Sequence, residues 1–210
     1  MLSKQNISSL IIILFHLVGL YGFLNPNLTD FFIQLVPFHL LLMLALLVIS
    51  GNDGSMNIRL FALVVFIFGF LIEVAGVNTG LIFGSYTYGA TLGLKLWETP
   101  LLIGVNWLIL VYSTGVLLNG FRLNKYLLAL LGAIILVSID FLIEPVAIRY
   151  DYWSWTEQII PMQNYLGWFA VSFTMFILFT SVNFKKQNRS AIVLFVAQVC
   201  FFIILNRWGT

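Results

Sequence analysis

The stretch LFALVVFIFGFLIEVAGV, from Leu60 to Val77, decides the fold class of this chain. As a helix it is long enough to cross the hydrocarbon core of a bilayer, which is about 30 Å thick. Glu73 is the one charged residue within it. Because a charged side chain near the centre of such a helix costs roughly 2.5 kcal/mol or more, Glu73 is expected to have a partner or a task.

The composition of the whole chain agrees with a membrane protein. Of its 210 residues, 61% are hydrophobic and 9% are charged, whereas soluble domains carry about 25% charged residues. The mean hydropathy is +1.03. The net charge of +2 is too small to indicate a nucleic-acid partner. The single cysteine, Cys200, excludes an internal disulfide and a cysteine-based metal site.

Seven apolar runs predict an all-α, polytopic membrane helical bundle that forms one domain over residues 1–210. We interpret the first run as a retained helix because it lacks a clear small-residue cleavage site. Pro37 is expected to kink the second run. The runs are Ile7–Phe23, Phe31–Ile49, Leu60–Val77, Pro100–Leu118, Leu127–Ile143, Tyr165–Val182 and Ala191–Leu205.

The basic residues predict the orientation of the bundle in a bacterial cytoplasmic membrane. In a seven-span arrangement, seven of them lie on the side of the amino terminus and three on the other side. This excess predicts a cytoplasmic amino terminus. The first group is Lys4, Arg59, Arg122, Lys125, Lys185, Lys186 and Arg189, and the second is Lys95, Arg149 and Arg207.

Two long connections, Asn78–Thr99 and Glu144–Asn164, are rich in tyrosine and tryptophan. These residue types prefer the membrane interface. Irregular backbone at that depth is allowed only where protein or a wet cavity covers it. We therefore expect both connections to be re-entrant or interfacial and to cover one mouth of the bundle.

Three acids are predicted to reach a similar depth beneath that mouth. Glu73 lies fourteen residues after Arg59, and Asp140 lies fifteen after Lys125, which is roughly 21–22 Å along each helix. Glu144 follows Asp140 by four residues and so is nominally on the same face. Pro145, however, is expected to push Glu144 out of helical geometry.

Carboxyl groups that share an apolar site do not all ionise, so at least one is expected to stay protonated and to act as an acid. The alternative is that each acid is neutral, or is paired with Lys95 or Arg149, and only holds helices together.

Other polar features carry weaker signals. His16 and His39 favour a helix-to-helix hydrogen bond over a ligand role, and without a spaced carboxylate they make a poor metal site. Gly76, Gly80 and Gly84 indicate either a helix-packing face or a close backbone approach to a ligand. Asp140-Phe-Leu-Ile-Glu144 has the spacing of an acidic diphosphate–magnesium motif, but the second acidic motif that such enzymes need is missing. No P-loop, dinucleotide fingerprint or Ser/His/Asp set is present. The last run contains no lysine, which excludes a retinal Schiff base there.

A longer pattern resembles the membrane carotenoid-biosynthesis protein family, which includes carotenoid 1,2-hydratases and bisanhydrobacterioruberin hydratases. Its first half is Glu73-x-x-Gly76-x-x-Thr79-Gly80-x-x-Phe83-Gly84-x-Tyr86-x-Tyr88, followed by Gly93, Pro100-Leu101-Leu102-Ile103 and Trp107. Its second half is Asp140-x-x-x-Glu144-Pro145, Trp153-x-Trp155, Pro161, Asn164 and Leu166-Gly167-Trp168. The resemblance covers about residues 70 to 170.

The resemblance implies a cofactor-independent hydratase, a hydro-lyase that adds water to the terminal C-1,2 double bond of an acyclic carotenoid. It implies a lipid-soluble substrate taken from the bilayer, contact with membrane lipids and association with other carotenoid enzymes. Glu73, Asp140 and Glu144 would be catalytic. The implied substrate-binding residues are Thr79, Gly80, Phe83, Gly84, Tyr86, Tyr88, Trp107, Arg149, Trp153, Trp155, Asn164 and Trp168.

The residues themselves fit this chemistry, because a protonated carboxyl in a dry aromatic site can protonate an alkene and let one water capture the cation. Three alternatives stay open at this stage. A lycopene-type end-group cyclase shares the protonation step and ends in ring closure. A proton-coupled carrier would use the acids as a relay, and a pigment-binding scaffold would not use them chemically.

Overall fold

The computed structural model describes residues 3–209, which form seven long helices and two small two-stranded sheets. Each helix is long and apolar enough to cross a membrane, so the prediction of a polytopic helical bundle is confirmed. The helices are α1 (Lys4–Leu24), α2 (Thr29–Ser50), α3 (Met56–Thr79), α4 (Leu102–Asn119), α5 (Lys125–Arg149), α6 (Met162–Ser181) and α7 (Arg189–Trp208).

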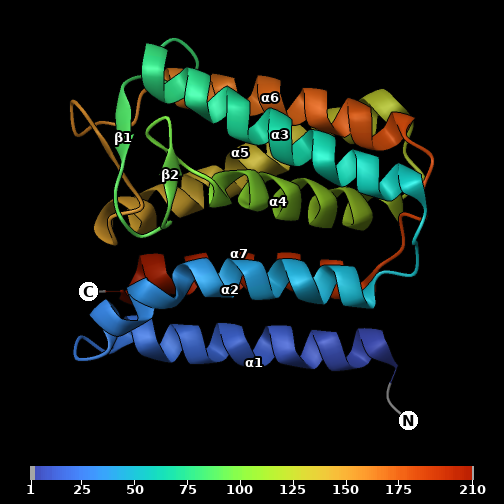
Figure 1. The fold of residues 1–210 in the computed structure, drawn as a ribbon, viewed down its shortest axis with the longest axis horizontal. Coiled ribbons are helices and arrows are strands. Elements are labelled where there is room, and N and C mark those ends of the chain that lie inside the picture. Colours follow the sequence, from blue (N-terminus) through green and yellow to red (C-terminus); the bar gives the residue numbers. More distant parts are fainter. Residues whose placement is uncertain (1–2, 210) are drawn as a thin grey trace.

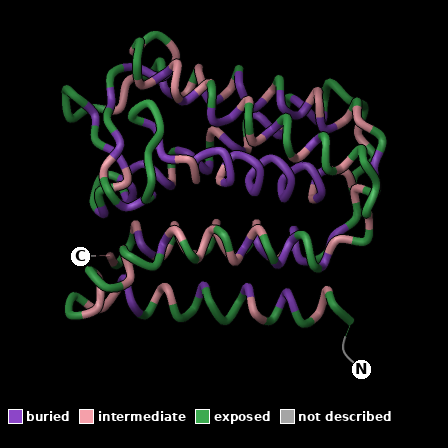
Figure 2. Tube along the Cα trace, viewed as in Figure 1, coloured by how far each residue is buried: buried purple, intermediate pink, exposed green. Residues whose placement is uncertain are grey.

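The helices lie side by side and form a layered bundle (Figure 1). Helix α1 packs against α2 and α7, whereas α5 packs against α6, and α3 against α4. Helix α4 is central, because it contacts α2, α3, α5, α6 and α7. It is also buried along nearly its whole length, as Figure 2 shows.

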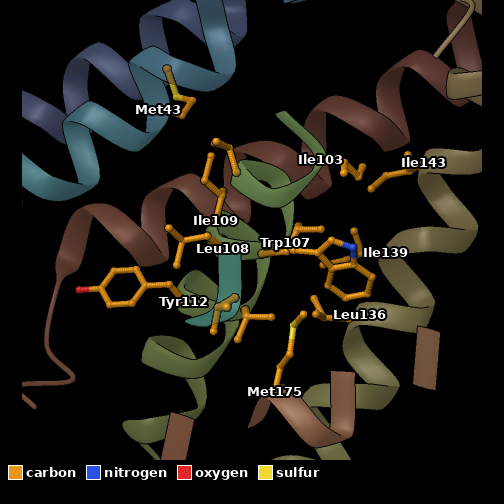
Figure 3. Packing of buried hydrophobic residues seen from close by; sticks show 14 of the residues in the cluster. Met43, Ile103, Trp107, Leu108, Ile109, Tyr112, Leu136, Ile139, Ile143 and Met175 are labelled. Atoms are coloured by element: carbon orange, nitrogen blue, oxygen red, sulfur yellow. The ribbon is translucent and has the colours of Figure 1, made fainter. Parts of the chain in front are cut away.

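Trp107 anchors the centre of the bundle. Its side chain is fully buried and lies beside Leu136 and Ile139 of α5 (Figure 3). Helix α3 approaches it at Gly69, where a β-carbon would lie only 2.7 Å from Trp107 Cβ. A glycine at this position therefore lets α3 and α4 pack closely around the indole.

The two aromatic connections pair with each other across the end of the bundle. Strand β1 (Tyr86–Tyr88) is antiparallel to β4 (Trp153–Trp155), with Tyr86 opposite Trp155 and Tyr88 opposite Trp153. A second pair, β2 (Lys95–Leu96) and β3 (Thr99–Pro100), closes the first connection. We call this end, where α3 and α5 finish and the strands lie, the sheet end of the bundle.

The expectation that Pro145 removes Glu144 from helical geometry is wrong. Helix α5 continues through Pro145 to Arg149, so Glu144 stays one turn beyond Asp140 on the same face. A proline inside a helix removes the donor to the carbonyl four residues earlier, here that of Phe141. Asn206 of α7 donates from Nδ2 to the neighbouring Leu142 carbonyl at 2.6 Å and so joins α7 to this turn of α5. Helix α2 is likewise uninterrupted at Pro37.

Candidate active site

The structure brings the three acids together beneath the paired strands. Helix α3 carries Glu73 and helix α5 carries Asp140 and Glu144, and all three are at most 3% exposed. Glu73 and Glu144 line one small pocket, and Asn164 of α6 bonds both Asp140 and Glu144. Four segments far apart in the sequence, α3, α5, α6 and the β1–β4 pair, therefore build one site.

Glu73 is surrounded by hydrogen-bond donors. Tyr86 and Tyr88 donate their hydroxyls to Oε2 at 2.5 and 2.7 Å, and Trp107 donates Nε1 to Oε1 at 2.9 Å. Alternate residues of a strand point to the same side, which is why Tyr86 and Tyr88 of β1 reach the same carboxyl. Three donors and no positive charge make this an anion site formed by neutral groups.

Glu144 has an equivalent environment, built by the other strand. Trp153 and Trp155 of β4 donate their indole N–H groups to Oε2 at 3.0 and 2.8 Å. Asn164 Nδ2 lies 3.2 Å from Oε1. Because an indole N–H can only donate, the two tryptophans favour an ionised Glu144.

Asp140 differs from the two glutamates. Its Oδ2 accepts from Asn164 Nδ2 at 2.7 Å, whereas Oδ1 is buried and has no hydrogen-bond partner within residues 3–209. A buried carboxylate oxygen without a partner is costly, and a protonated carboxyl lowers that cost. The hydrogen bonds therefore favour a neutral Asp140 whose proton lies on the free Oδ1.

Burial raises the pKa values of the Tyr86 and Tyr88 hydroxyls well above the usual tyrosine range, and the charge of Glu73 raises them further. A raised tyrosine pKa means that the neutral, donating form is the stabilised one. Both hydroxyls therefore remain donors to Glu73 at any physiological pH.

The pocket between Glu73 and Glu144 is small and has aromatic walls. Asp140 does not line it and is connected to it through Asn164. The volume of the pocket is about 20 Å³, which is enough for one water molecule. Phe83, Trp155 and Trp168 line it, and the Trp168 ring stacks on Trp107 with centroids 4.3 Å apart. Aromatic faces stabilise a nearby cation, and the two glutamates would add negative charge. The site can thus hold one water between two carboxylates, close to a stabilised positive charge, with Asp140 on the far side of Asn164.

The model of the carotenoid biosynthesis protein family matches residues 32–208, a range that contains every residue of this site. The chain belongs to this family. It is 31% identical over 135 residues to a protein from Haloarcula japonica named bisanhydrobacterioruberin hydratase. That match covers 60% of this chain and 45% of the relative, so the chain spans under half of the relative's length. No solved structure matches it significantly.

The resemblance implied a substrate-binding role for Thr79, Gly80 and Gly84. In this carotenoid biosynthesis protein these residues lie at the sheet end and do not line the pocket. Thr79 donates to the Ala75 carbonyl at 2.6 Å, and Gly80 ends α3 with φ +67°. Gly84 turns the chain with φ +105° toward Pro161. These three residues shape the turn that delivers Phe83 and Tyr86 to the pocket.

The cations do not pair with the acids. Arg149 lies past the end of the site and donates to the Leu205 carbonyl at 3.0 Å, so the structure does not bring this residue to the pocket. Lys95 donates from Nζ to the Tyr88 carbonyl. The alternative in which these residues neutralise the acids therefore has no support in the geometry.

Two further placements differ from expectation. His16 bonds the Ile12 carbonyl of its own helix at 2.8 Å instead of bonding another helix, and it meets the His39 ring edge-on at 4.9 Å. Ile103 lines the acid pocket but was not assigned to the site, although it belongs to the family-like pattern at Pro100-Leu101-Leu102-Ile103. Residues 3–209 contain no group of three or more His, Cys, Asp or Glu side chains placed to hold a metal ion.

Proposed function

We propose that this protein hydrates the terminal C-1,2 double bond of an acyclic carotenoid by acid catalysis. The observation that carries the proposal is the unequal hydrogen bonding of the three buried acids. Glu73 and Glu144 each accept three hydrogen bonds, whereas Asp140 keeps one oxygen free. This inequality supports one proton donor beside two carboxylates. The name of the relative, a hydratase, supports the same reaction class.

In the first step, Asp140 gives its proton to the less substituted carbon of the terminal double bond. The π electrons form the new C–H bond, and the other carbon becomes a tertiary carbocation. The neighbouring charges of Glu73 and Glu144 and the faces of Trp155 and Trp168 stabilise this cation. Positioned carboxyl groups in such a step typically contribute about 10²–10⁴-fold in rate.

In the second step, one water held in the pocket attacks the carbocation and forms the C–O bond. Glu144 takes the proton that the water loses, and this proton returns to Asp140, which lies one helical turn away. The sum is one alkene plus one water giving one tertiary alcohol. The reaction is redox-neutral, so a proton donor and a water are sufficient for it.

The size of the pocket favours hydration over cyclisation. A cyclase must exclude water from the cation, whereas a volume of about 20 Å³ between carboxylates and an amide suits a single bound water. The substrate itself would enter sideways from the bilayer, where a long polyene dissolves.

Asp140→Asn tests the proposal in a lycopene-producing host, by mass analysis of the pigments per unit of membrane protein. The amide keeps the shape and removes the acidic proton, so we expect hydroxylated product to fall by about 10²–10⁴-fold. Asp30→Asn, the same change at an exposed position of α2, is the matched control and should retain activity.

Full activity of Asp140→Asn would contradict the proposal. Hydration adds the mass of one water to the pigment and cyclisation adds none, so a product of unchanged mass from the wild type would identify a cyclase instead.

A further inference from the structure

A second, much larger cavity lies between α1, α2, α4 and α7. Its volume is about 470 Å³, within the range of sites that bind small organic molecules. On α2 it extends from Phe31 to Leu42, eleven residues or roughly 16 Å along the helix. The mechanism proposed above uses none of the residues that α1, α2 and α7 contribute to it.

The walls of this cavity are apolar and open toward lipid. Phenylalanines of α1, α2 and α7 supply much of the surface. Three of them, Phe15, Phe31 and Phe38, are also 42% or more exposed on the outside of the bundle. The opening therefore lies along α1 and α2, where the surface faces the bilayer, and a lipid-soluble ligand can enter without crossing water.

The large cavity adjoins the acid pocket. Ile103 of α4 and Trp153 of β4 line both, so they form the partition between the two spaces. Trp153 also bonds Glu144 through Nε1. A volume of about 20 Å³ cannot hold the branched end of an isoprenoid, so any organic substrate of the acids must lie mostly on the far side of this partition.

We propose that the large cavity binds the chain of an acyclic isoprenoid polyene and directs its end group past Ile103 and Trp153 to the acids. The directing part rests on the proposed function, whereas the binding part does not. Three observations favour this occupant: the apolar walls, the opening to lipid and the continuity with the acid pocket.

The end of the cavity that lies away from the sheet end, which we call the inner end, contains polar side chains. His16 and His39 line it there, together with Gln198, whose Oε1 is buried without a partner in the described chain. A hydrocarbon cannot satisfy this acceptor. The chain is therefore expected to fill the outer part, and Gln198→Leu should strengthen polyene binding by a few-fold.

The test is a binding measurement with lycopene on purified protein in lipid nanodiscs, made in an Asp140→Asn background so that no turnover occurs. The readout is circular dichroism induced in the achiral polyene. Leu40→Trp replaces an aliphatic side chain by a bulky indole ring in the cavity and should weaken binding at least about 10-fold. Leu41→Trp, the neighbouring change at an exposed position outside the cavity, should bind like the parent.

Gly19→Leu is a second blocking variant, because a β-carbon there would lie 3.3 Å from the Phe201 ring inside the cavity. If both blocking variants fold and bind lycopene normally, or if only phospholipid occupies the cavity, the chain site is wrong. A loss of binding in Gln198→Leu would place a hydrogen-bonding ligand at the inner end and overturn the hydrocarbon assignment.

These results are separable from those that test hydration. If Asp140→Asn still forms product while Leu40→Trp loses lycopene binding, the proposed mechanism fails and the chain site stands. If Asp140→Asn abolishes product and Leu40→Trp binds lycopene normally, the proposed mechanism stands and the chain site fails.

Discussion

The three buried carboxyl groups differ in their neighbours more than in their depth. Two of them accept hydrogen bonds from aromatic side chains, Glu73 from two tyrosines and Glu144 from two tryptophans. These neutral donors stabilise a negative charge on each glutamate without a cation. Asp140 has a single amide partner. The division of roles between acid and carboxylates is therefore decided by side chains of other elements.

At this residue scale we predict that Tyr86 and Tyr88 do not ionise near pH 10, where ordinary tyrosines titrate. Burial and the charge of Glu73 raise the pKa values of both hydroxyls, so their neutral form persists above that pH. The absorbance change of tyrosinate between about pH 9 and 11 should be equal in the wild type and in the Tyr86→Phe/Tyr88→Phe variant.

A smaller absorbance change in the double variant than in the wild type would mean that the two buried hydroxyls do titrate, and the anion site around Glu73 would then be incorrectly described.

The sequence could predict the acids, because a charge within an apolar run is conspicuous. It could also predict the aromatic residues as a group. It could not assign Trp107 and Tyr86 to Glu73, or Trp153 to Glu144, because these bonds join segments up to 34 residues apart and depend on how the helices pack. The family-like pattern contained Ile103, but an isoleucine has no polar group that would assign it to the pocket rather than to the packing of the helices.

At the scale of elements, the paired strands β1 and β4 are the feature that turns two connections into one lid. Three-residue strands are too short to show an alternating pattern, so the sequence indicated only aromatic segments. The continuation of α5 through Pro145 was likewise hidden, because the local preference of a residue before proline is against helix, and only the packing of α5 on other helices can override it.

The turn before β1 gives an element-scale prediction. Gly84 has φ +105°, and a β-carbon there would lie 2.6 Å from Pro161 Cγ. Gly84→Ala should therefore displace the lid from α6 and lower stability by roughly 1–3 kcal/mol, with lower product formation. Thermal unfolding in detergent measures the first effect and pigment analysis the second.

Gly54→Ala is the matched control for this turn, because no heavy atom lies within 4 Å of a β-carbon at that position. It should unfold at the wild-type temperature. Equal stability of the Gly84 and Gly54 variants would show that the turn does not need glycine.

At the scale of the whole molecule, the hydrophobic runs were sufficient to predict seven spanning helices, because each run marks a helix that is long and apolar enough to cross a membrane. The same runs could not predict the large cavity between α1, α2, α4 and α7. A cavity is a property of packing, and its lining residues come from segments as far apart in the sequence as Phe15 and Phe202.

The orientation of the bundle remains a prediction at this scale. The excess of lysine and arginine at the end opposite the sheet end predicts that the amino terminus faces the cytoplasm. Single cysteines at the exposed positions Gln187 and Thr156, in a Cys200→Ser background, report the two ends. A membrane-impermeant thiol reagent added to intact cells should label the Thr156→Cys protein only. Labelling of the Gln187→Cys protein alone would show that the orientation is the opposite of the predicted one.

The order of residues around the acids also has a consequence for how the protein is made. Every donor to Glu73 follows it along the chain, from Tyr86 to Trp107, and the donors to Asp140 and Glu144 follow them too. Because synthesis proceeds from the amino terminus, each acid leaves the ribosome before its partners exist. The carboxyl groups therefore enter the bilayer most cheaply as neutral acids. The donors to Glu73 are complete once Trp107 of α4 is in place, whereas those to Glu144 are complete only with Asn164 of α6.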